Sequence, residues 1–264
     1  MIRYISGLFL IIVFVSCEAE ALPIAPEEVN VETGRQVIDF SKISPDSLIV
    51  LCSTSSNRNK SIGVLGGSYT ITEESAIVKN SWCHYLNCSV TDYGKSGYGF
   101  SINQGSIQDE ADNCDVKDIY VLWASTNDFN FNQPAGIPTD FTFRDNYSPN
   151  SRITQCGGIN YCIKTLKEKN PNCLIVMISS SLFLQSEKGY NMSVTNGTGK
   201  NLVYYVNAQW ECCRINKVPF LNLLDSINLT REDFCIDCLH YNENGYNKLV
   251  IPSTLLIAQP SLFM

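Results

Sequence analysis

This sequence predicts an α/β fold in three layers, with a parallel sheet of about five strands between two layers of helices. Short apolar runs alternate along the chain with longer amphipathic segments, which is the pattern of strands joined by crossover helices. No segment repeats at a fixed period. Of the 264 residues, 44% are hydrophobic and 17% are charged, so the chain has enough apolar side chains for one sizeable core.

The expected strands are short and rich in branched or aromatic residues, as strands buried on both faces usually are. They lie at Ile62–Leu65, Ser89–Tyr93, Asp118–Ala124, Cys173–Ser179 and Val218–Leu223. Helices are expected near 72–86, 106–114, 153–169, 200–215 and 242–257. Right-handed crossovers then place helices on both faces of the sheet. One further apolar run, Ser47–Cys52, is expected to be either an added edge strand or a packing segment.

The N-terminus has the pattern of an export signal. Arg3 precedes an apolar run from Leu8 to Val15, and small and polar residues follow. The run is shorter than the roughly 18 apolar residues that a transmembrane helix needs. We therefore expect residues 1–21 to be a signal peptide and the protein to be exported to the periplasm, the cell surface or the medium.

Two processing routes fit the end of this signal. Cys17 stands where a bacterial lipoprotein carries its lipid, whereas Ala19-Glu20-Ala21 resembles an ordinary cleavage site. We favour the lipid anchor at Cys17, which would be the protein's only contact with a membrane. Residues 22–45 are then expected to be a tether, and residues 46–264 the folded domain.

Composition bears on partners and on redox state. The net charge of −7 gives no basic surface for phosphates, so nucleic acid is not an expected partner and small neutral esters fit better. Twelve cysteines are more than a reduced cytosolic enzyme usually carries, so some disulfides are expected. Cys235 and Cys238 form half of a zinc-site pattern with Cys212-Cys213, but we favour disulfides because no histidine spacing supports a metal.

Ligands of parallel α/β sheets bind outside the carboxyl ends of the strands, so the residues that follow each strand are the candidates for chemistry. Ser68 follows Gly66-Gly67 after the first expected strand, at a turn into a helix. Such a serine either caps the helix or serves as a nucleophile. The G-x-S-x-G motif of α/β-hydrolases is not satisfied, because Thr70 stands at its last position.

Two further strand ends carry polar or glycine-rich sequence. Residues 92–100 form a glycine-dense loop around Gly97, where the backbone is able to approach a ligand closely. Ser125-Thr126-Asn127-Asp128 follows the third expected strand and places an amide and a carboxylate there. Alone, each of these segments is typical of a turn.

The last candidate is the pair Asp237 and His240. The sequence has two histidines, and His84 lies within an expected helix, so His240 is the expected base of any serine hydrolase chemistry. A short turn allows Asp237 to bind one imidazole nitrogen while the other faces Ser68.

Together these four segments, in this order, resemble the four motif blocks of the SGNH hydrolases, also called GDSL-like hydrolases. The resemblance covers residues 60–257 and differs from the family pattern at Gly67, where the family has Asp, and at Ser125, where it has Gly. It implies a flavodoxin-like sheet and a serine esterase with no metal or organic cofactor. Ser68, His240 and Asp237 would be the catalytic triad, and Ser68, Gly97 and Asn127 would form the oxyanion hole.

The substrate is less defined by the sequence than the reaction is. Export and possible tethering favour an O-acylated glycan, and a lipid or aryl ester is the alternative. Tyr69, Tyr98 and Phe129 are expected substrate contacts, whereas Trp123 is expected to pack in the core. A protein that binds glycans on the same fold without turnover is the alternative from another functional class.

Overall fold

The computed structural model of the chain describes residues 38–102, 105–142, 149–183 and 192–264. The chain divides into two units, Met1–Arg35 and Gln36–Met264, and everything below concerns the second. The expected signal peptide, Cys17 and most of the expected tether lie outside the described residues.

A sheet of five parallel strands forms the centre of the fold. The strands are β1 (Ser61–Gly66), β2 (Ser89–Asp92), β3 (Ile119–Trp123), β4 (Leu174–Ile178) and β5 (Phe220–Leu221). Their order in the sheet is β2-β1-β3-β4-β5, which is the flavodoxin-like order. The register pairs Ile62 of β1 with Val90 of β2 and with Ile119 of β3. The predicted parallel α/β sheet is therefore confirmed.

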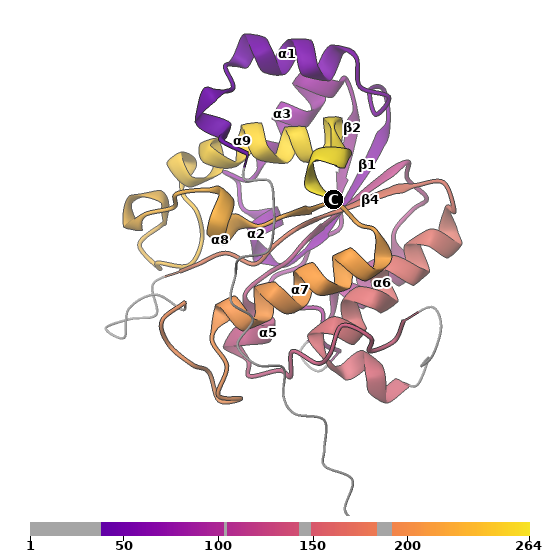
Figure 1. Ribbon diagram of the computed structural model, residues 1–264, viewed down its shortest axis with the longest axis vertical. Helices are drawn as coiled ribbons and strands as arrows, with labels where there is room; N and C mark the ends of the chain where they lie inside the picture. Colours follow the sequence, from indigo (N-terminus) through magenta and orange to yellow (C-terminus); the bar gives the residue numbers. More distant parts are fainter. Residues whose placement is uncertain (1–37, 103–104, 143–148, 184–191) are drawn as a thin grey trace, which may run out of the picture. The chain divides into compact units, whose positions relative to one another are not determined.

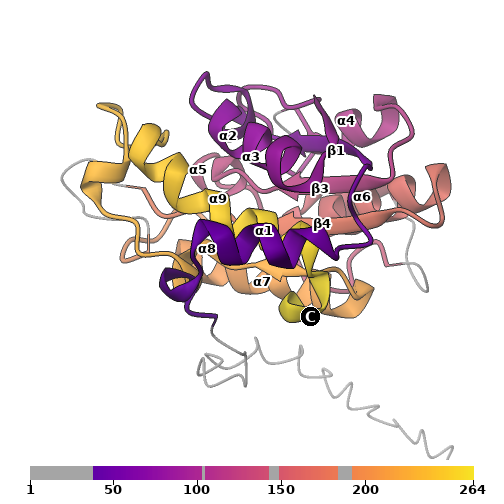
Figure 2. The ribbon, with the colours of Figure 1, turned by 90° about the horizontal axis from the view of Figure 1, so that it is seen from above.

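Two groups of helices cover the sheet. The longer helices are α1 (Pro45–Ser53), α3 (Ala76–Leu86), α4 (Ile107–Asn113), α6 (Gln155–Lys169), α7 (Leu202–Asn216) and α9 (Glu243–Ala258). Figure 1 shows α1, α3 and α9 on one side of the strands and α6 and α7 on the other, and these groups pack among themselves. Helix α4 packs beside α6, as Figure 2 also shows. Short helices α2 (Ser68–Ile71), α5 (Asn127–Asn130) and α8 (Leu223–Ser226) follow β1, β3 and β5.

Local sequence signals fix where the long helices begin. Thr154, Asn201 and Asn242 each accept a hydrogen bond from a backbone N–H in the first turn of α6, α7 and α9, respectively. Helix α9 therefore begins at Glu243, three residues after His240. Strand β3 is buried along its whole length, which explains its continuous apolar sequence.

The apolar run Ser47–Cys52 lies within helix α1 and is not an edge strand. Ser44 caps this helix by accepting a hydrogen bond from the Ser47 N–H, and Pro45 stands at its first position. Leu48 and Cys52 face the core. The folded part also begins before residue 46, because the Phe40 ring stacks on Phe263 with centroids 6.2 Å apart.

The cysteines differ from expectation as well. Each cysteine from Cys52 to Cys238 is a free thiol, so the expected disulfides are absent from the described residues. Most of these side chains are buried, where cysteine packs as a small apolar residue. The thiols of Cys156 and Cys212 are hydrogen-bonded, and this contact together with burial raises the pKa of Cys156 well above its usual value.

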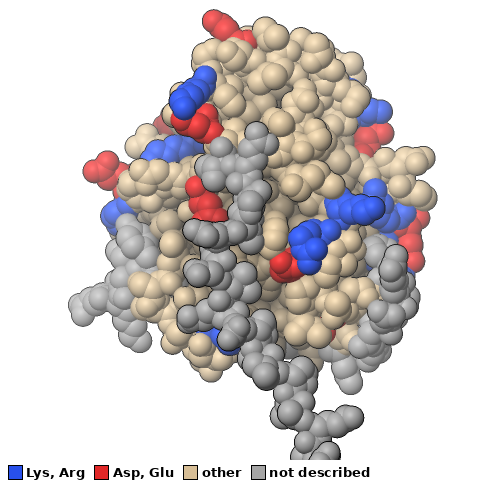
Figure 3. Space-filling model, in the orientation of Figure 1, with Lys and Arg blue, Asp and Glu red and all other residues tan. Residues whose placement is uncertain are grey.

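Two surface properties bear on partners. None of the described helices is both long and apolar enough to cross a membrane. On the face seen in Figure 3, charged side chains stand in small groups that mix both signs, and most of the surface between them is uncharged.

Candidate active site

Ser68 lies at the turn between β1 and α2. Gly67 is the only residue between them, and its backbone is extended. A side chain at Gly66 would place its Cβ atom 2.7 Å from the carbonyl oxygen of Trp123, so the close approach of β3 requires glycine there. The turn therefore projects Ser68 from the carboxyl edge of the sheet.

A closed loop carries Asp237 and His240. The loop is joined at its base by a bridge between Phe234 and Tyr241, and the Cys235 N–H donates to the His240 carbonyl oxygen at 2.8 Å. Cys238 has φ +59°, a left-handed conformation that turns the chain sharply between the acid and the histidine. The Asp237 Oδ1 atom accepts hydrogen bonds from the backbone N–H groups of Leu239 and His240, both at 3.0 Å.

These two segments, far apart in the sequence, meet in a continuous chain of hydrogen bonds. The His240 Nε2 atom lies 2.7 Å from Ser68 Oγ, and His240 Nδ1 lies 2.7 Å from Asp237 Oδ2. The Tyr69 ring lies next to the His240 ring in a tilted arrangement, with ring centroids 5.8 Å apart. The three residues predicted to form a triad are therefore in contact, and each distance is short enough for proton transfer or orientation.

Asp237 is held as a carboxylate. Partial burial acts to raise its pKa, but hydrogen bonds from the His240 ring and from the Leu239 and His240 backbone outweigh it, so its pKa lies below the ordinary value. The side chain is 49% exposed, so water also contributes to its solvation. An ionised Asp237 favours the tautomer in which the Nδ1 atom of His240 carries the proton and Nε2 is free to accept one.

The oxyanion-hole candidates lie on the loops after β2 and β3. Gly97 has φ +80°, and an added Cβ atom would meet nothing within 4 Å, so this backbone is open on one side. Asn127 is the first residue of α5, and its Nδ2 atom donates to the Tyr98 carbonyl oxygen at 2.9 Å. This hydrogen bond uses one of the two amide N–H groups and joins Asn127 to the loop that contains Gly97.

The two departures from the family pattern lie against each other. A Cβ atom added to Gly67 would lie 2.7 Å from Ser125 Cβ and 2.8 Å from the Tyr98 carbonyl oxygen. The Ser125 hydroxyl donates to that same oxygen at 2.6 Å. Ser125 thus fills the space that a side chain at position 67 would need. The two departures from the family pattern, Gly67 and Ser125, therefore depend on each other through packing.

Asp128 holds the loop after β2 in place through hydrogen bonds to its backbone. Its two carboxyl oxygens accept from the backbone N–H groups of Phe100 and Ser101 at 2.8 and 2.9 Å. The residue is 2% exposed, and burial raises its pKa to about 6 against the effect of these two hydrogen bonds. Its place is structural support for the loop, next in sequence to Asn127.

The predicted aromatic contacts separate into two groups. Tyr69 and Phe129 are 2% and 1% exposed, so their rings offer almost no surface to a substrate. Trp123 is buried, as the sequence suggests. Tyr98 is half-buried and lies under the Lys95 ammonium group, 5.4 Å from the ring centroid. His84 is an exposed helical residue in edge-on contact with Tyr85, so it has no part in this site.

Glu110 also reaches the nucleophile turn, although the sequence analysis does not single it out. It lies on α4, and its Oε2 atom accepts from the Gly66 N–H at 2.8 Å. A usable signal exists in the sequence: Ile107, Ala111 and Cys114 form an apolar stripe at helical spacing, and Glu110 lies on that same stripe.

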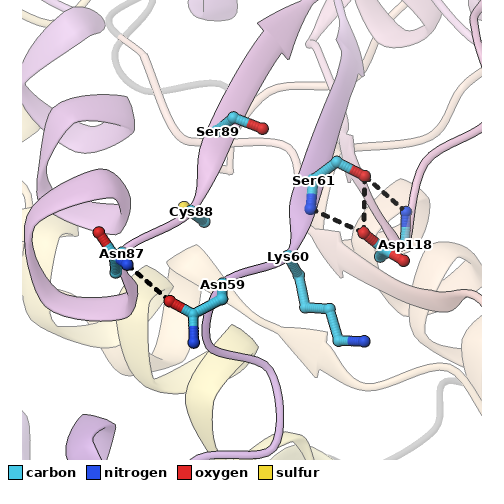
Figure 4. A pocket seen from close by; sticks show the side chains of 7 residues that line it. All are labelled: Asn59, Lys60, Ser61, Asn87, Cys88, Ser89 and Asp118. Carbon is cyan, nitrogen blue, oxygen red and sulfur yellow. Dashed lines mark hydrogen bonds between the residues drawn. The ribbon is translucent and has the colours of Figure 1, made fainter.

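A hollow elsewhere in the described part of the protein lacks the features of this site. A hollow at the amino ends of β1, β2 and β3 is lined by Asn59, Lys60, Ser61, Asn87, Cys88, Ser89 and Asp118 (Figure 4). It lies at the opposite end of the strands from Ser68, and its polar groups bond one another, as in the 2.6 Å contact of Asn87 with Asn59. Across the described residues, no group of three or more His, Cys, Asp or Glu side chains is placed so that it could hold a metal ion.

Comparison with known proteins identifies the type of fold. No protein-family model matches the sequence, and no curated protein matches it significantly. Solved structures do match. A candidate lipase from Chitinophaga pinensis is 16% identical, over 77% of this chain and 99% of its own, with a TM-score of 0.59. A candidate GDSL-like lipase from Bacteroides uniformis is 16% identical over 77% and 96%, with a TM-score of 0.53. The chain has the SGNH hydrolase fold.

A third neighbour is an aryl esterase of M. smegmatis, 14% identical over 78% of this chain and 100% of its own, with a TM-score of 0.54. At such identities the similarity establishes the SGNH fold alone, so the chemistry has to be argued from the site.

Proposed function

We propose that this chain is an exported serine esterase that cleaves carboxylic esters through an acyl-enzyme formed on Ser68. The observation that carries the proposal is the hydrogen-bond chain from Ser68 Oγ to His240 to Asp237, with both distances at 2.7 Å. Export is supported by the N-terminal pattern of Arg3 and the apolar run after it. The mass of the mature N-terminus tests that part, because an intact Met1 would contradict it.

In the proposed mechanism, Ser68 Oγ attacks the ester carbonyl carbon as His240 Nε2 takes the hydroxyl proton. The C–O bond to the alcohol then breaks, and His240 returns the proton to the leaving oxygen. Water repeats the two steps and releases the acid. Asp237 stays ionised throughout and stabilises the imidazolium that forms at each step.

The negative charge on the tetrahedral oxygen needs hydrogen-bond donors. The backbone N–H groups of Ser68 and Gly97 and the side-chain amide of Asn127 are the proposed donors. Asn127 is 9% exposed, so little water competes with it. Loss of one such donor typically costs about 3 kcal/mol of transition-state stabilisation.

For the substrate we propose an O-acyl group on a glycan, with Tyr98 as the surface on which a sugar ring stacks. The backbone carbonyl oxygen of Tyr98 accepts a hydrogen bond from Asn127, which places Tyr98 on the loop of the proposed oxyanion hole. The Tyr98 ring is half-buried. A second class, an aryl or lipid ester, is favoured by two exposed apolar side chains close in sequence to the triad. Ile71 is 46% exposed and Ile236 is 96% exposed.

The test is Ser68→Ala with a fluorophosphonate probe and p-nitrophenyl acetate. Wild type should bind the probe covalently and hydrolyse the ester, and the variant should do neither while unfolding at the same temperature, because the side chain is small. Ser96→Ala is the matched control, since Ser96 is an exposed serine on the neighbouring loop and its loss should change nothing.

Acetylated sugars, aryl esters and lipid esters should be compared as substrates in the same assay. If wild type hydrolyses none of them but binds a glycan equally well with and without Ser68, the chain is a binding protein on this fold.

A further inference from the structure

Glu110 is a buried carboxyl group next to the proposed nucleophile that the mechanism above does not use. It lies on α4 and is 3% exposed. Its Oε2 atom accepts from the N–H of Gly66, two residues before Ser68, at 2.8 Å. Buried carboxyl groups are uncommon unless they have a specific partner, so this contact needs an explanation.

The end of strand β1 provides one. The pairing of β1 with β2 stops at Val64 and Asp92. Strand β1 continues beside β3 as far as Gly66, and the Gly66 carbonyl oxygen accepts from the Lys95 N–H, beyond the end of β2, at 3.1 Å. The Gly66 N–H points to the same side, where β2 offers no further carbonyl, and without Glu110 it would be a buried donor with no partner.

The same helix also binds the proposed oxyanion-hole loop. The Ile107 N–H donates to the Gly99 carbonyl oxygen at 2.9 Å, and Gln108 Nε2 donates to the Phe100 carbonyl oxygen at 2.6 Å. Helix α4 therefore contacts both the strand end that leads to Ser68 and the loop that follows Gly97. It links the position of the strand end to that of the loop through hydrogen bonds to both.

We propose that Glu110 is a positioning residue for Ser68, whose carboxyl group fixes the end of β1 and so the distance from the nucleophile to the oxyanion donors. This inference rests on the proposed esterase function. Glu110 touches neither substrate nor triad, and it acts through Gly66. At neutral pH we expect the carboxyl group to be neutral, because a buried charge would be costly there, although either form can accept from the Gly66 N–H.

The surroundings of Glu110 favour that neutral form. Burial raises its pKa to about 9, against the lowering effects of the Gly66 N–H and of the charge and backbone N–H of Lys95. The charged and titratable groups that face it are Asp92 on β2, Lys95 on the next loop and Cys162 on α6. Asp92 raises the pKa further, although it is itself paired with Lys79 at 2.6 Å. Among the described residues, Glu110 Oε1 has no hydrogen-bond partner.

Three variants test the proposal. Glu110→Gln keeps an oxygen acceptor for the Gly66 N–H and cannot ionise. Glu110→Leu removes the acceptor at similar volume. Asp109→Asn is the matched control, because Asp109 is the exposed carboxylate next to Glu110 on the same helix. Each is assayed for kcat and KM on p-nitrophenyl acetate from about pH 6 to about pH 11.

At neutral pH, Glu110→Gln and the control should keep the wild-type kcat, and Glu110→Leu should lose on the order of ten- to a hundredfold in kcat with little change in KM. Above about pH 9 the wild-type kcat should fall as Glu110 ionises, because a buried charge would disturb the packing of α4 on β1 that positions Ser68, and Glu110→Gln should lack that fall. A merely structural role predicts no such difference in the pH profile. An alkaline fall that is equal in wild type and Glu110→Gln would overturn the proposal, even if Glu110→Leu does not fold.

Infrared difference spectroscopy separates this proposal from the proposed function. The carbonyl band of a protonated carboxylic acid should disappear in wild type as the pH passes about 9, and it should be missing in Glu110→Gln. Absence of that band in wild type at neutral pH would overturn the neutral, positioning role. If the band is present but no ester is hydrolysed, the esterase proposal fails while the buried neutral carboxyl group stands.

Discussion

Two regions of the site use carboxyl groups in opposite ways. Around the nucleophile turn and the oxyanion-hole loop, Glu110 and Asp128 are 3% and 2% exposed, and burial raises their pKa values to about 9 and about 6. In the loop Phe234–Tyr241, Asp237 is 49% exposed and its pKa lies below the ordinary value. The first two accept hydrogen bonds from backbone N–H groups, whereas Asp237 also binds the His240 ring.

The difference shows how burial assigns roles within one site. A buried carboxyl group is best used as a hydrogen-bond acceptor for the backbone, since its charge is poorly solvated. A half-exposed one with a histidine partner keeps its charge at low cost and can stabilise an imidazolium. The nucleophile side is therefore a rigid frame, and the histidine loop provides the charge.

The largest effect is expected from removing the negative charge that faces His240. Asp237→Asn should lower kcat on the order of 10³- to 10⁴-fold, because the amide donates to His240 Nδ1 and moves the ring proton to Nε2, which then cannot accept the Ser68 proton. The unfolding temperature should change little, since the side chain is half-exposed. Rates on p-nitrophenyl acetate and thermal unfolding measure the two effects.

Glu232→Gln is a suitable control for the lost charge. Glu232 is an exposed carboxylate just before the same loop, and its side chain contacts neither Ser68 nor His240 in the hydrogen bonds of the described residues. Its substitution should leave kcat unchanged. A rate for Asp237→Asn close to that of this control would mean that Asp237 does not orient the histidine during turnover.

Sequence patterns predict most of the fold, because strands and helices have local sequence signals. The five expected strands overlap β1 to β5, and their order is the flavodoxin-like one that the family resemblance implies. The exception is instructive: Ser47–Cys52 is rich in branched residues, but the Ser44 cap and Pro45 start a helix there. Strand β5 is also short, Phe220–Leu221, because it lies at the edge and pairs only with Met177 and Ile178.

The site is predictable only in part. Ser68 directly follows the end of β1, where a parallel sheet places its ligands, and the spacing of Asp237 and His240 is recognisable although α8 separates them from β5. Glu110 lies on a helix far from any motif, and its burial depends on the packing of α4 against β1 and α6. The contact between Gly67 and Ser125 is likewise a tertiary one, since these residues follow neighbouring strands β1 and β3.

A smaller effect is expected from disturbing the frame at Gly67. Its backbone is extended, so Gly67→Asp is not strained by its φ angle, and the cost comes from contact with Ser125 and Tyr98. We expect a loss of about 1–3 kcal/mol in the free energy of unfolding and a fall in kcat of about tenfold. Urea denaturation and ester hydrolysis measure these quantities.

Ser125→Gly provides the control for this prediction. Alone it should cost about 1 kcal/mol, because the hydroxyl bond to the Tyr98 carbonyl oxygen is lost. Combined with Gly67→Asp it should restore part of the stability, giving a coupling of about 0.5–3 kcal/mol between the two positions. Strict additivity of the two substitutions would show that they do not share one space.

The smallest expected effect concerns the pH dependence of the frame itself. The folded pKa of Asp128 is about 6 and its ordinary value is 3.8, so between these pH values the folded protein holds a proton that the unfolded chain has released. The contribution of Asp128 to the free energy of unfolding should therefore rise as the pH is lowered from about 7 to about 5, by about 1 kcal/mol. Asp237 behaves in the opposite sense, because its pKa is lowered on folding. Its contribution to the free energy of unfolding is present above the ordinary pKa of an aspartate and is lost as the pH falls below that value.

Urea denaturation of wild type and Asp128→Asn at about pH 7 and about pH 5 isolates the effect of Asp128, since all other groups are common to the two proteins. The stability difference between them should be larger at the lower pH, and a smaller difference there would mean that Asp128 is ionised in the folded state at both values and belongs with Asp237 rather than with Glu110.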